Sequence, residues 1–356
     1  MQVSPTRDSR GEEGVVLLLV LVLVVVAIST AYAMSKTSLI EVLSTRQHEQ
    51  YTRADLLARS GIGLAERALQ DDLVEGTDVT RTVESDLDAW AVLSHEDIEL
   101  PGGAVLRVRI HDAGNKIDIN ALVDAEGKRI GDSSKNFLKA VLAHVRDTVP
   151  ELKNSPSLRD QAIDDLADAI LDWLDKDDQT RVGTPEPEYY VEIKKAKSPP
   201  LNRPVFSLDE LADVPGLDPL LLEALKAYFT PYPMFPGTDG GGVNLNTAPA
   251  HVLALIYHGT GDDFRLVDQR DVFTLLKARA DGSVFCTTAT QKPCTTFSET
   301  VGIAEGETIF PPLTYTSKVF RVDSEATVGD TRACVRTVID RGTGAEPKTL
   351  YYELGC

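Results

Sequence analysis

The feature that most constrains this chain is an uninterrupted apolar run close to its N-terminus. No charged residue stands between Val15 and Met34, and residues 15–28 are all Val, Leu, Ile or Ala. Twenty helical residues extend about 30 Å, which is enough to cross the hydrocarbon core of a bilayer. We therefore expect residues 15–34 to form a transmembrane segment.

A cleaved signal peptide is the main alternative, since Ala31-Tyr32-Ala33 has the small-residue pattern of a cleavage site. The residues before the run argue against it, because acidic side chains accompany the two arginines there. The helical pattern also continues beyond the run. Residues 38–73 contain no proline and carry apolar side chains at helical spacing, so the sequence predicts one helix of about 90 Å over residues 15–73. An ordinary membrane anchor with a helical stalk fits the same pattern.

Beyond this helix the pattern predicts an α+β fold, in which helices interrupt an antiparallel β domain. A half-buried strand is expected at 105–110, and the clearest helix runs from Asp160 to Leu174, where apolar side chains form one stripe. Further helices are expected at 137–149, as two short pieces within 207–228, and over 244–257 behind an Asn or Thr cap. Strands are expected at 318–323, 326–328, 331–339 and 350–354.

The N-terminal part resembles the type IV prepilin family. A short polar leader ends in Gly14, and the apolar run and the long helix follow directly. The resemblance implies that prepilin peptidase cuts between Gly14 and Val15 and that the new N-terminus is methylated. Most members carry a glutamate as the fifth residue after the cut, where this chain has Leu19. The K-type minor pseudopilins of type II secretion systems characteristically lack that glutamate.

Most of the remaining chain is similar to the K-type pseudopilins, in the same order. The matching segments are ADLLARSGIGLAERAL at 54–69, residues 108–120 ending in KIDIN, DAILDWLDKDD with a trailing EPEYY within 164–190, residues 206–215, VNLNTA at 243–248, and residues 318–332. The resemblance implies a pilin-like antiparallel β domain with a large inserted α-helical domain that contains helix-hairpin-helix-like units. The expected divisions are a leader at 1–14, the membrane segment at 15–34, the first pilin part at 35–120, the insertion at 121–236 and the remaining β domain at 237–356.

The function implied by the resemblance is a non-enzymatic assembly subunit that caps and initiates the pseudopilus. Its expected partners are the I-, J- and H-type minor pseudopilins, the major pseudopilin, prepilin peptidase and the inner-membrane secretion platform. The chain would cross the bacterial inner membrane once, with its globular part in the periplasm. Leu19 agrees with a place at the tip, since a subunit with nothing ahead of it needs no carboxylate for the next subunit's amine.

Carboxylates cluster at the end of the Asp160 to Leu174 helix and in the loop that follows. Closely spaced carboxylates repel unless they are solvated or shared by a hard cation such as Ca²⁺, although the spacing here does not match an EF-hand loop. A solvated helix face is the alternative. The resemblance implies calcium binding in this part of the chain, and we expect the ligands to be Asp172, Asp175, Asp177 and Asp178.

All four cysteines, Cys286, Cys294, Cys334 and Cys356, lie in the last 71 residues. An even number beyond a membrane anchor suggests disulfides in an oxidising compartment, and the C-x-x-C pairs usual for zinc are absent. Four cysteines allow three connectivities and also the possibility of free thiols. We favour Cys286 with Cys294, closing a short loop, and Cys334 with Cys356.

Two other classes of function are weighed against the assembly subunit. A membrane-anchored DNA receptor would use the hairpin-like segments 211–218 and 243–253, but Asp218 takes the place of a phosphate-binding glycine. The net charge of −19 also opposes nucleic-acid binding. A calcium-dependent enzyme on a membrane stalk needs a catalytic constellation, and the spacing of the six histidines suggests none. A minor pilin of a related type IV pilus system stays open as a neighbouring alternative.

Overall fold

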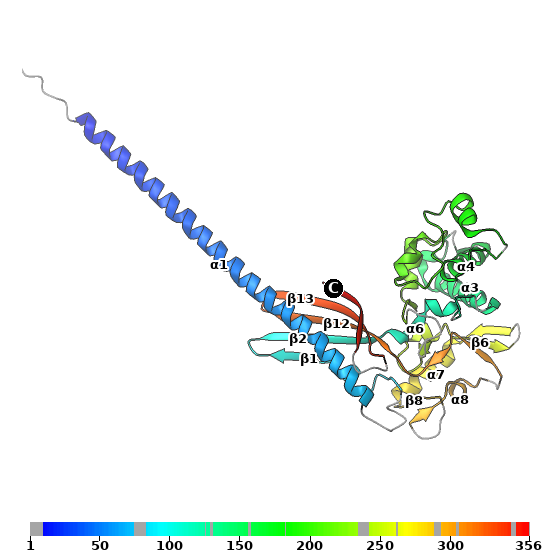
Figure 1. Ribbon diagram of the computed structural model, residues 1–356. Helices are drawn as coiled ribbons and strands as arrows, with labels where there is room; N and C mark the ends of the chain where they lie inside the picture. The colour runs from blue at the N-terminus through cyan, green and yellow to red at the C-terminus, as the bar shows by residue number, and fades with distance from the viewer. Residues whose placement is uncertain are drawn as a thin grey trace, which may run out of the picture.

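The computed structural model describes residues 10–74, 83–124, 126–128, 131–155, 158–181, 183–233, 242–260, 263–287, 293–303, 306–342 and 347–355. Its most prominent element is α1, a single helix of 65 residues from Arg10 to Val74 (Figure 1). Glycines 61 and 63 do not break it, so the prediction of one continuous helix is confirmed. Of the described helices, only α1 is long and apolar enough to cross a membrane. Its apolar N-terminal half extends away from the rest of the protein (Figure 1).

The C-terminal half of α1 crosses one face of a five-stranded antiparallel sheet in the order β1-β2-β12-β13-β14. The strands are β1 (Asp97–Leu100), β2 (Ala104–Asp112), β12 (Val319–Val328), β13 (Thr331–Asp340) and β14 (Lys348–Leu354). Residues at helical spacing on α1, among them Ala58, Ile62 and Leu69, are buried against alternate strand residues such as Val108, Phe320 and Val335. This is the pilin-like part of the predicted fold.

The opposite face of the sheet carries charged side chains that pair across the strands. Arg107 of β2 contacts Asp97 of β1 at 2.8 Å and Glu325 of β12 at 3.2 Å, and Arg336 of β13 contacts Asp323 of β12 at 2.6 Å. One face is therefore packed on α1 and the other is polar, as is common for antiparallel sheets.

Between β2 and β12 the chain forms a second body with its own core (Figure 1). Its helical elements are η2 (Ala113–Asn115), η3 (Ile119–Leu122), α3 (Gly131–Thr148), η4 (Pro150–Leu152), α4 (Asp160–Leu174), η6 (Pro187–Ile193), η7 (Leu208–Asp213), α5 (Pro219–Leu225), α6 (Ala250–Leu253), α7 (Gln269–Ala280) and α8 (Phe297–Val301). Its short strands are β3 (Ile117–Asp118), β4 (Phe229–Thr230), β5 (Val243–Asn244), β6 (Tyr257–Thr260), β7 (Asp263–Leu266), β8 (Val284–Phe285), β9 (Cys294–Thr295), β10 (Thr308–Phe310) and β11 (Leu313–Thr314). Helix α2 (Ala89–Leu93) lies before β1.

Two expectations for the middle of the chain need correction. Within the described residues, the five-stranded sheet takes no strand between Asp112 and Val319, so the chain rejoins the β domain about eighty residues after the expected boundary at 237. The physical reason is that side chains from Val243 to Phe310 pack into the same core as α3 and α4. The helix expected over 244–257 is also wrong. Asn244 lies in β5, Pro249 caps the four-residue α6, and Tyr257 begins β6.

The close approach of α1 to the sheet depends on Gly61. A Cβ atom at this position would overlap Ser324 Oγ and lie 3.1 Å from both Leu106 Cδ1 and Val108 Cγ2. A Cβ at Gly63, two residues further on, would meet nothing within 4 Å. The two glycines therefore form a matched pair, one at the packed face and one at the exposed face of the same helix turn.

We expect Gly61→Ala to lower the free energy of unfolding by about 1–3 kcal/mol, because the added methyl overpacks the contact between helix and sheet. Gly63→Ala should raise it by about 0.5–1 kcal/mol, because alanine is the better helix former at an exposed position. Urea unfolding of the detergent-solubilised chain measures both values. Equal effects of the two substitutions would show that Gly61 is not a packing contact.

Candidate metal centre and buried polar junction

The acidic face of α4 is partly neutralised by α3. Lys135 contacts the carboxylates of Asp164 and Asp168 at 2.7 Å each, and Lys139 contacts Asp164 at 2.7 Å. Hydrogen bonds from the two lysines lower the pKa of Asp164 to about 2. These two aspartates therefore bridge the helices, and the face is not simply solvated.

The candidate metal centre lies at the end of α4 and joins Asp175, Asp177 and Glu186. One carboxylate oxygen from each lies within 4.8 Å of the others. Asp175 is the C-cap residue of α4, and both Asp175 and Glu186 are fully buried, while Asp177 is exposed. A tight loop brings Glu186 back to Asp175, since the Glu186 N–H donates to the Asp178 carbonyl at 2.9 Å.

Two of the four expected ligands, Asp175 and Asp177, belong to this group, and the other two do not. Asp172 lies one turn earlier on α4, where its buried carboxylate accepts a hydrogen bond from the Tyr190 hydroxyl. The Asp178 carboxylate accepts from the Gln179 side chain at 3.0 Å. Glu186 was not among the expected ligands, although it follows the same loop in the sequence. It joins the group because the chain turns back at Gly183, whose φ is 80°.

The donor set suits a hard divalent cation. All three side chains offer carboxylate oxygens, which Ca²⁺ prefers over nitrogen or sulfur ligands. Two buried carboxylates so close together repel one another, and a bound cation would offset that repulsion. The residues that would hold the cation are therefore Asp175, Asp177 and Glu186, with further oxygens supplied by water or main-chain carbonyls.

A second acidic group is formed by Asp72, Glu84 and Asp88, and two of its carboxylates, those of Asp72 and Glu84, pair with a cation of the protein itself. The Arg341 guanidinium, which is 3% exposed, contacts Asp72 at 2.9 Å and Glu84 more closely still. It also donates to the Leu69 and Ser317 carbonyls. Burial raises the pKa of Asp88 to about 6. Because the arginine supplies the positive charge, this group needs no metal ion. Its role is structural, since Arg341 connects the end of α1 to Glu84 and to the Ser317 carbonyl.

The VNLNTA segment completes this buried polar junction. The Asn244 amide donates to Asp112 at 2.9 Å, to Ser317 Oγ at 3.1 Å and to the Glu84 carbonyl at 3.2 Å. The Thr247 hydroxyl donates to the same Asp112 carboxylate, which is buried. Burial raises the pKa of Asp112 against the opposing effect of these donors. The motif thus ties the last residue of β2 to the insertion, and its role is structural.

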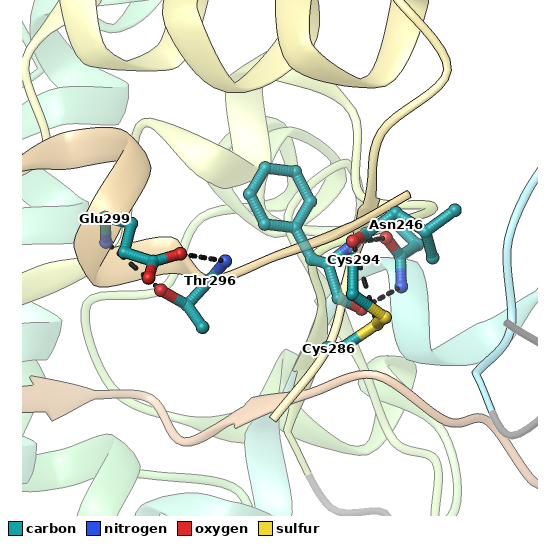
Figure 2. Close-up of a disulfide and its surroundings, with 7 residues drawn as sticks. Asn246, Cys286, Cys294, Thr296 and Glu299 are labelled. Carbon is teal, nitrogen blue, oxygen red and sulfur yellow. Dashed lines mark hydrogen bonds between the residues drawn. A yellow bond between two sulfur atoms is a disulfide. The ribbon is translucent and has the colours of Figure 1, made fainter. Parts of the chain in front are cut away.

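The next asparagine of the segment secures the disulfide region (Figure 2). Cys286 and Cys294 form a disulfide, and Asn246 exchanges hydrogen bonds of 3.0 and 2.7 Å with the backbone of Phe285 beside it. Thr296 and Glu299 form a capping box at the start of α8 nearby. Cys334 is also disulfide-bonded, and the partner that we predict for it, Cys356, lies outside the described residues.

In the hairpin-like segment 211–218, the backbone N–H groups after Asp218 are not open to a phosphate. The Asp218 carboxylate caps α5 by accepting from the Leu221 N–H at 2.9 Å. A carboxylate at the start of this helix fills the position that an anionic ligand would need. The geometry therefore disfavours the DNA receptor.

Comparison with known proteins gives consistent matches. A family model described as type II secretion system (T2SS), protein K, matches residues 115–234. The type II secretion system protein K of Pseudomonas aeruginosa is 24% identical over 352 residues, which cover 97% of this chain and 94% of that protein. A chain in the crystal structure of the GspK–GspI–GspJ complex from enterotoxigenic Escherichia coli has a TM-score of 0.56 at 19% identity, and the match covers 88% of this chain and 99% of that one.

Asp118, in the short strand β3, allows the electrostatics of a buried carboxyl group to be tested. Its carboxyl group is 2% exposed, accepts from the Asn120 N–H at 2.9 Å, and has one oxygen without a hydrogen-bond partner among the described residues. Burial raises the pKa of Asp118 to about 8. The folded protein thus holds a proton that the unfolded chain releases near pH 4, so the stability contributed by this group is lost as pH rises from about 4 to 8.

We expect Asp118→Asn to raise the melting temperature, with a gain that is larger at pH 8 than at pH 5. The amide keeps the oxygen that accepts from Asn120 and removes the cost of a buried charge. Asp330→Asn, the same change at an exposed position, should shift the melting temperature little at either pH. A gain for Asp118→Asn that does not depend on pH would contradict the raised pKa.

Proposed function

We propose that this chain, which belongs to the protein K family of type II secretion systems, is a minor pseudopilin that caps and initiates the pseudopilus. The observation that carries the proposal is α1. One unbroken helix contains both an apolar segment and a stripe that packs on a pilin-like sheet. The apolar segment is exposed, since no other described part of the chain packs on it. In this role the chain is a non-enzymatic assembly component of protein export.

The position in the cell follows from the same helix. Residues 15–34 would anchor the chain in the bacterial inner membrane, with the sheet and the insertion in the periplasm. The disulfide between Cys286 and Cys294 supports an oxidising compartment for that part. Processing by prepilin peptidase between Gly14 and Val15, followed by methylation, would free the helix for assembly. Most of the leader lies outside the described residues.

The proposed partners are other pseudopilins and the inner-membrane platform. The Escherichia coli neighbour was crystallised as a complex of GspK with GspI and GspJ. By analogy, we infer that this chain assembles with the I-, J- and H-type minor pseudopilins and, through them, with the major pseudopilin. The absence of an acid at Leu19 and the bulk of the insertion between β2 and β12 both favour one copy at the tip over repeated copies along a shaft.

Calcium is the proposed cofactor, held by Asp175, Asp177 and Glu186. Its role would be structural, because the carboxylates fasten the loop after α4 to the end of that helix. It would therefore stabilise the insertion and take no part in chemistry.

The function is tested by changing the residue at which processing is proposed. Gly14→Val should leave unprocessed protein in the membrane and reduce secretion through the system, because the peptidase requires the glycine next to the apolar run. Gly11→Val is the matched control within the leader and should be processed and secrete normally. Immunoblots and a secretion assay read both outcomes, and normal secretion by the Gly14 variant would contradict the proposal.

Calcium should raise the melting temperature of the chain, because a ligand that binds only the folded state stabilises it by about 2.7 kcal/mol at a hundred times its Kd. The double variant Asp175→Asn with Glu186→Gln should lose that rise and should be at least as stable as the native chain in chelator, where the buried charges repel. Asp178→Asn, whose carboxylate lies outside the group, should keep the response. An equal melting temperature of the native chain in calcium and in chelator would rule the site out.

A further inference from the structure

The two edges of the five-stranded sheet are built differently. At one edge, β1 has only four residues, and its Asp97 is occupied by Arg107 and Arg109 at 2.8 and 3.1 Å. Short, charged edge strands discourage pairing with another chain. At the other edge, β14 has seven residues and contains no proline. No described strand pairs with it on its outer side.

The backbone of β14 offers hydrogen-bonding groups on that outer side. The Gly355 N–H donates to the Cys334 carbonyl, and Arg336 lies opposite Glu353 in the antiparallel register. Because the backbone groups of successive residues point to opposite sides, those of Tyr352 and Leu354 point away from β13. These two residues are the positions at which an added strand would pair.

The side chains of β14 are unusually apolar for an exposed edge. Tyr351 is 44% exposed, Tyr352 is 45% exposed and Leu354 is 59% exposed. Tyr352 and Leu354 lie opposite Thr337 and the buried Val335, which places them on the face of the sheet that packs on α1. An added strand would therefore cover aromatic and aliphatic surface as well as backbone.

The helix beside this edge continues the surface. The Arg59 guanidinium reaches the Tyr352 hydroxyl at 3.2 Å while its Nε contacts Asp55 at 2.8 Å. Leu56, one turn before Arg59 on α1, is 59% exposed. Figure 1 shows the C-terminal end of the chain beside the sheet and well away from the helices α3 and α4. The exposed fractions of Tyr352 and Leu354 agree with an edge that the insertion does not cover.

We infer that the β14 edge receives an extended segment of another pseudopilin, which adds to the sheet as a sixth strand. The segment would carry apolar side chains toward Tyr352 and Leu354 and a carboxylate toward the exposed Lys348 at the start of the strand. A second copy of this chain fits less well, because a net charge of −19 opposes self-association. The inference rests on the proposed function, since it takes its partner from the same filament.

Hydrogen exchange of the full-length chain in detergent tests the inference directly. The probe is an equimolar mixture of the I- and J-type minor pseudopilins of the same secretion system. In the complex, the exchange rates of the Tyr352 and Leu354 amides should fall by a factor of at least about ten, whereas those of the β1 amides should be unchanged. If no complex forms, the proposed function fails. If a complex forms and the β14 amides exchange as fast as before, only the strand addition is refuted.

A pair of variants separates backbone pairing from side-chain docking. Tyr352→Pro and Tyr352→Ala both remove the phenol that contacts Arg59, but only proline also removes the backbone N–H. Because this N–H points away from β13, its loss breaks no hydrogen bond within the sheet. Both variants should keep the native melting temperature within a few degrees. We expect Tyr352→Pro to bind the two pseudopilins at least about tenfold more weakly than Tyr352→Ala. If both variants fold and bind the two pseudopilins with equal affinity, the inference is overturned. If the proline variant does not fold, the hydrogen-exchange experiment decides whether β14 pairs with an added strand.

Discussion

The structure depends on one helix that meets two different environments. The twenty uncharged residues after Gly14 suit a bilayer, whereas further along only a stripe that includes Ala58, Ile62 and Leu69 is buried, against the sheet. The small residues of that stripe, above all Gly61, let α1 lie close to β12. Because the helix covers only one face, the other face of the sheet must be compatible with water, and paired charges such as Arg336 with Asp323 provide this.

The second requirement is a firm connection between the sheet and the insertion. The chain leaves the sheet at Asp112 and returns at Val319, and both crossings lie in the buried polar junction formed by Asp112, Asn244, Ser317 and Arg341. Buried charges of this kind add little net stability, but removing one partner leaves the others uncompensated. The junction therefore fixes the orientation of the insertion relative to the sheet.

Elements with a strong local signal could be predicted from the sequence, and long-range choices could not. The apolar run and the stripe of Asp160–Leu174 were sufficient to place α1 and α4, and β13 was also expected in place. The strands expected at 318–323 and 326–328 are instead one continuous strand, β12. The boundary at 237 was wrong because the segment after it consists of short helices and strands. Only their packing decides whether they join the core of the insertion or that of the sheet, and they join the core of the insertion. Asn244 looked like a helix cap, but its amide is used to hold Asp112 and Ser317. Glu186 joins the candidate metal centre only because the loop after α4 folds back.

The central claim of this account is that the chain occupies the tip of a pseudopilus once. Immunogold labelling of pseudopili sheared from the native host, with an antibody against the insertion, measures this most directly. The account predicts one label at one end of each filament, in line with the missing acid at Leu19 and with an insertion too bulky for regular stacking. Labels repeated along the shaft, or long filaments formed by the purified full-length chain alone, would contradict it.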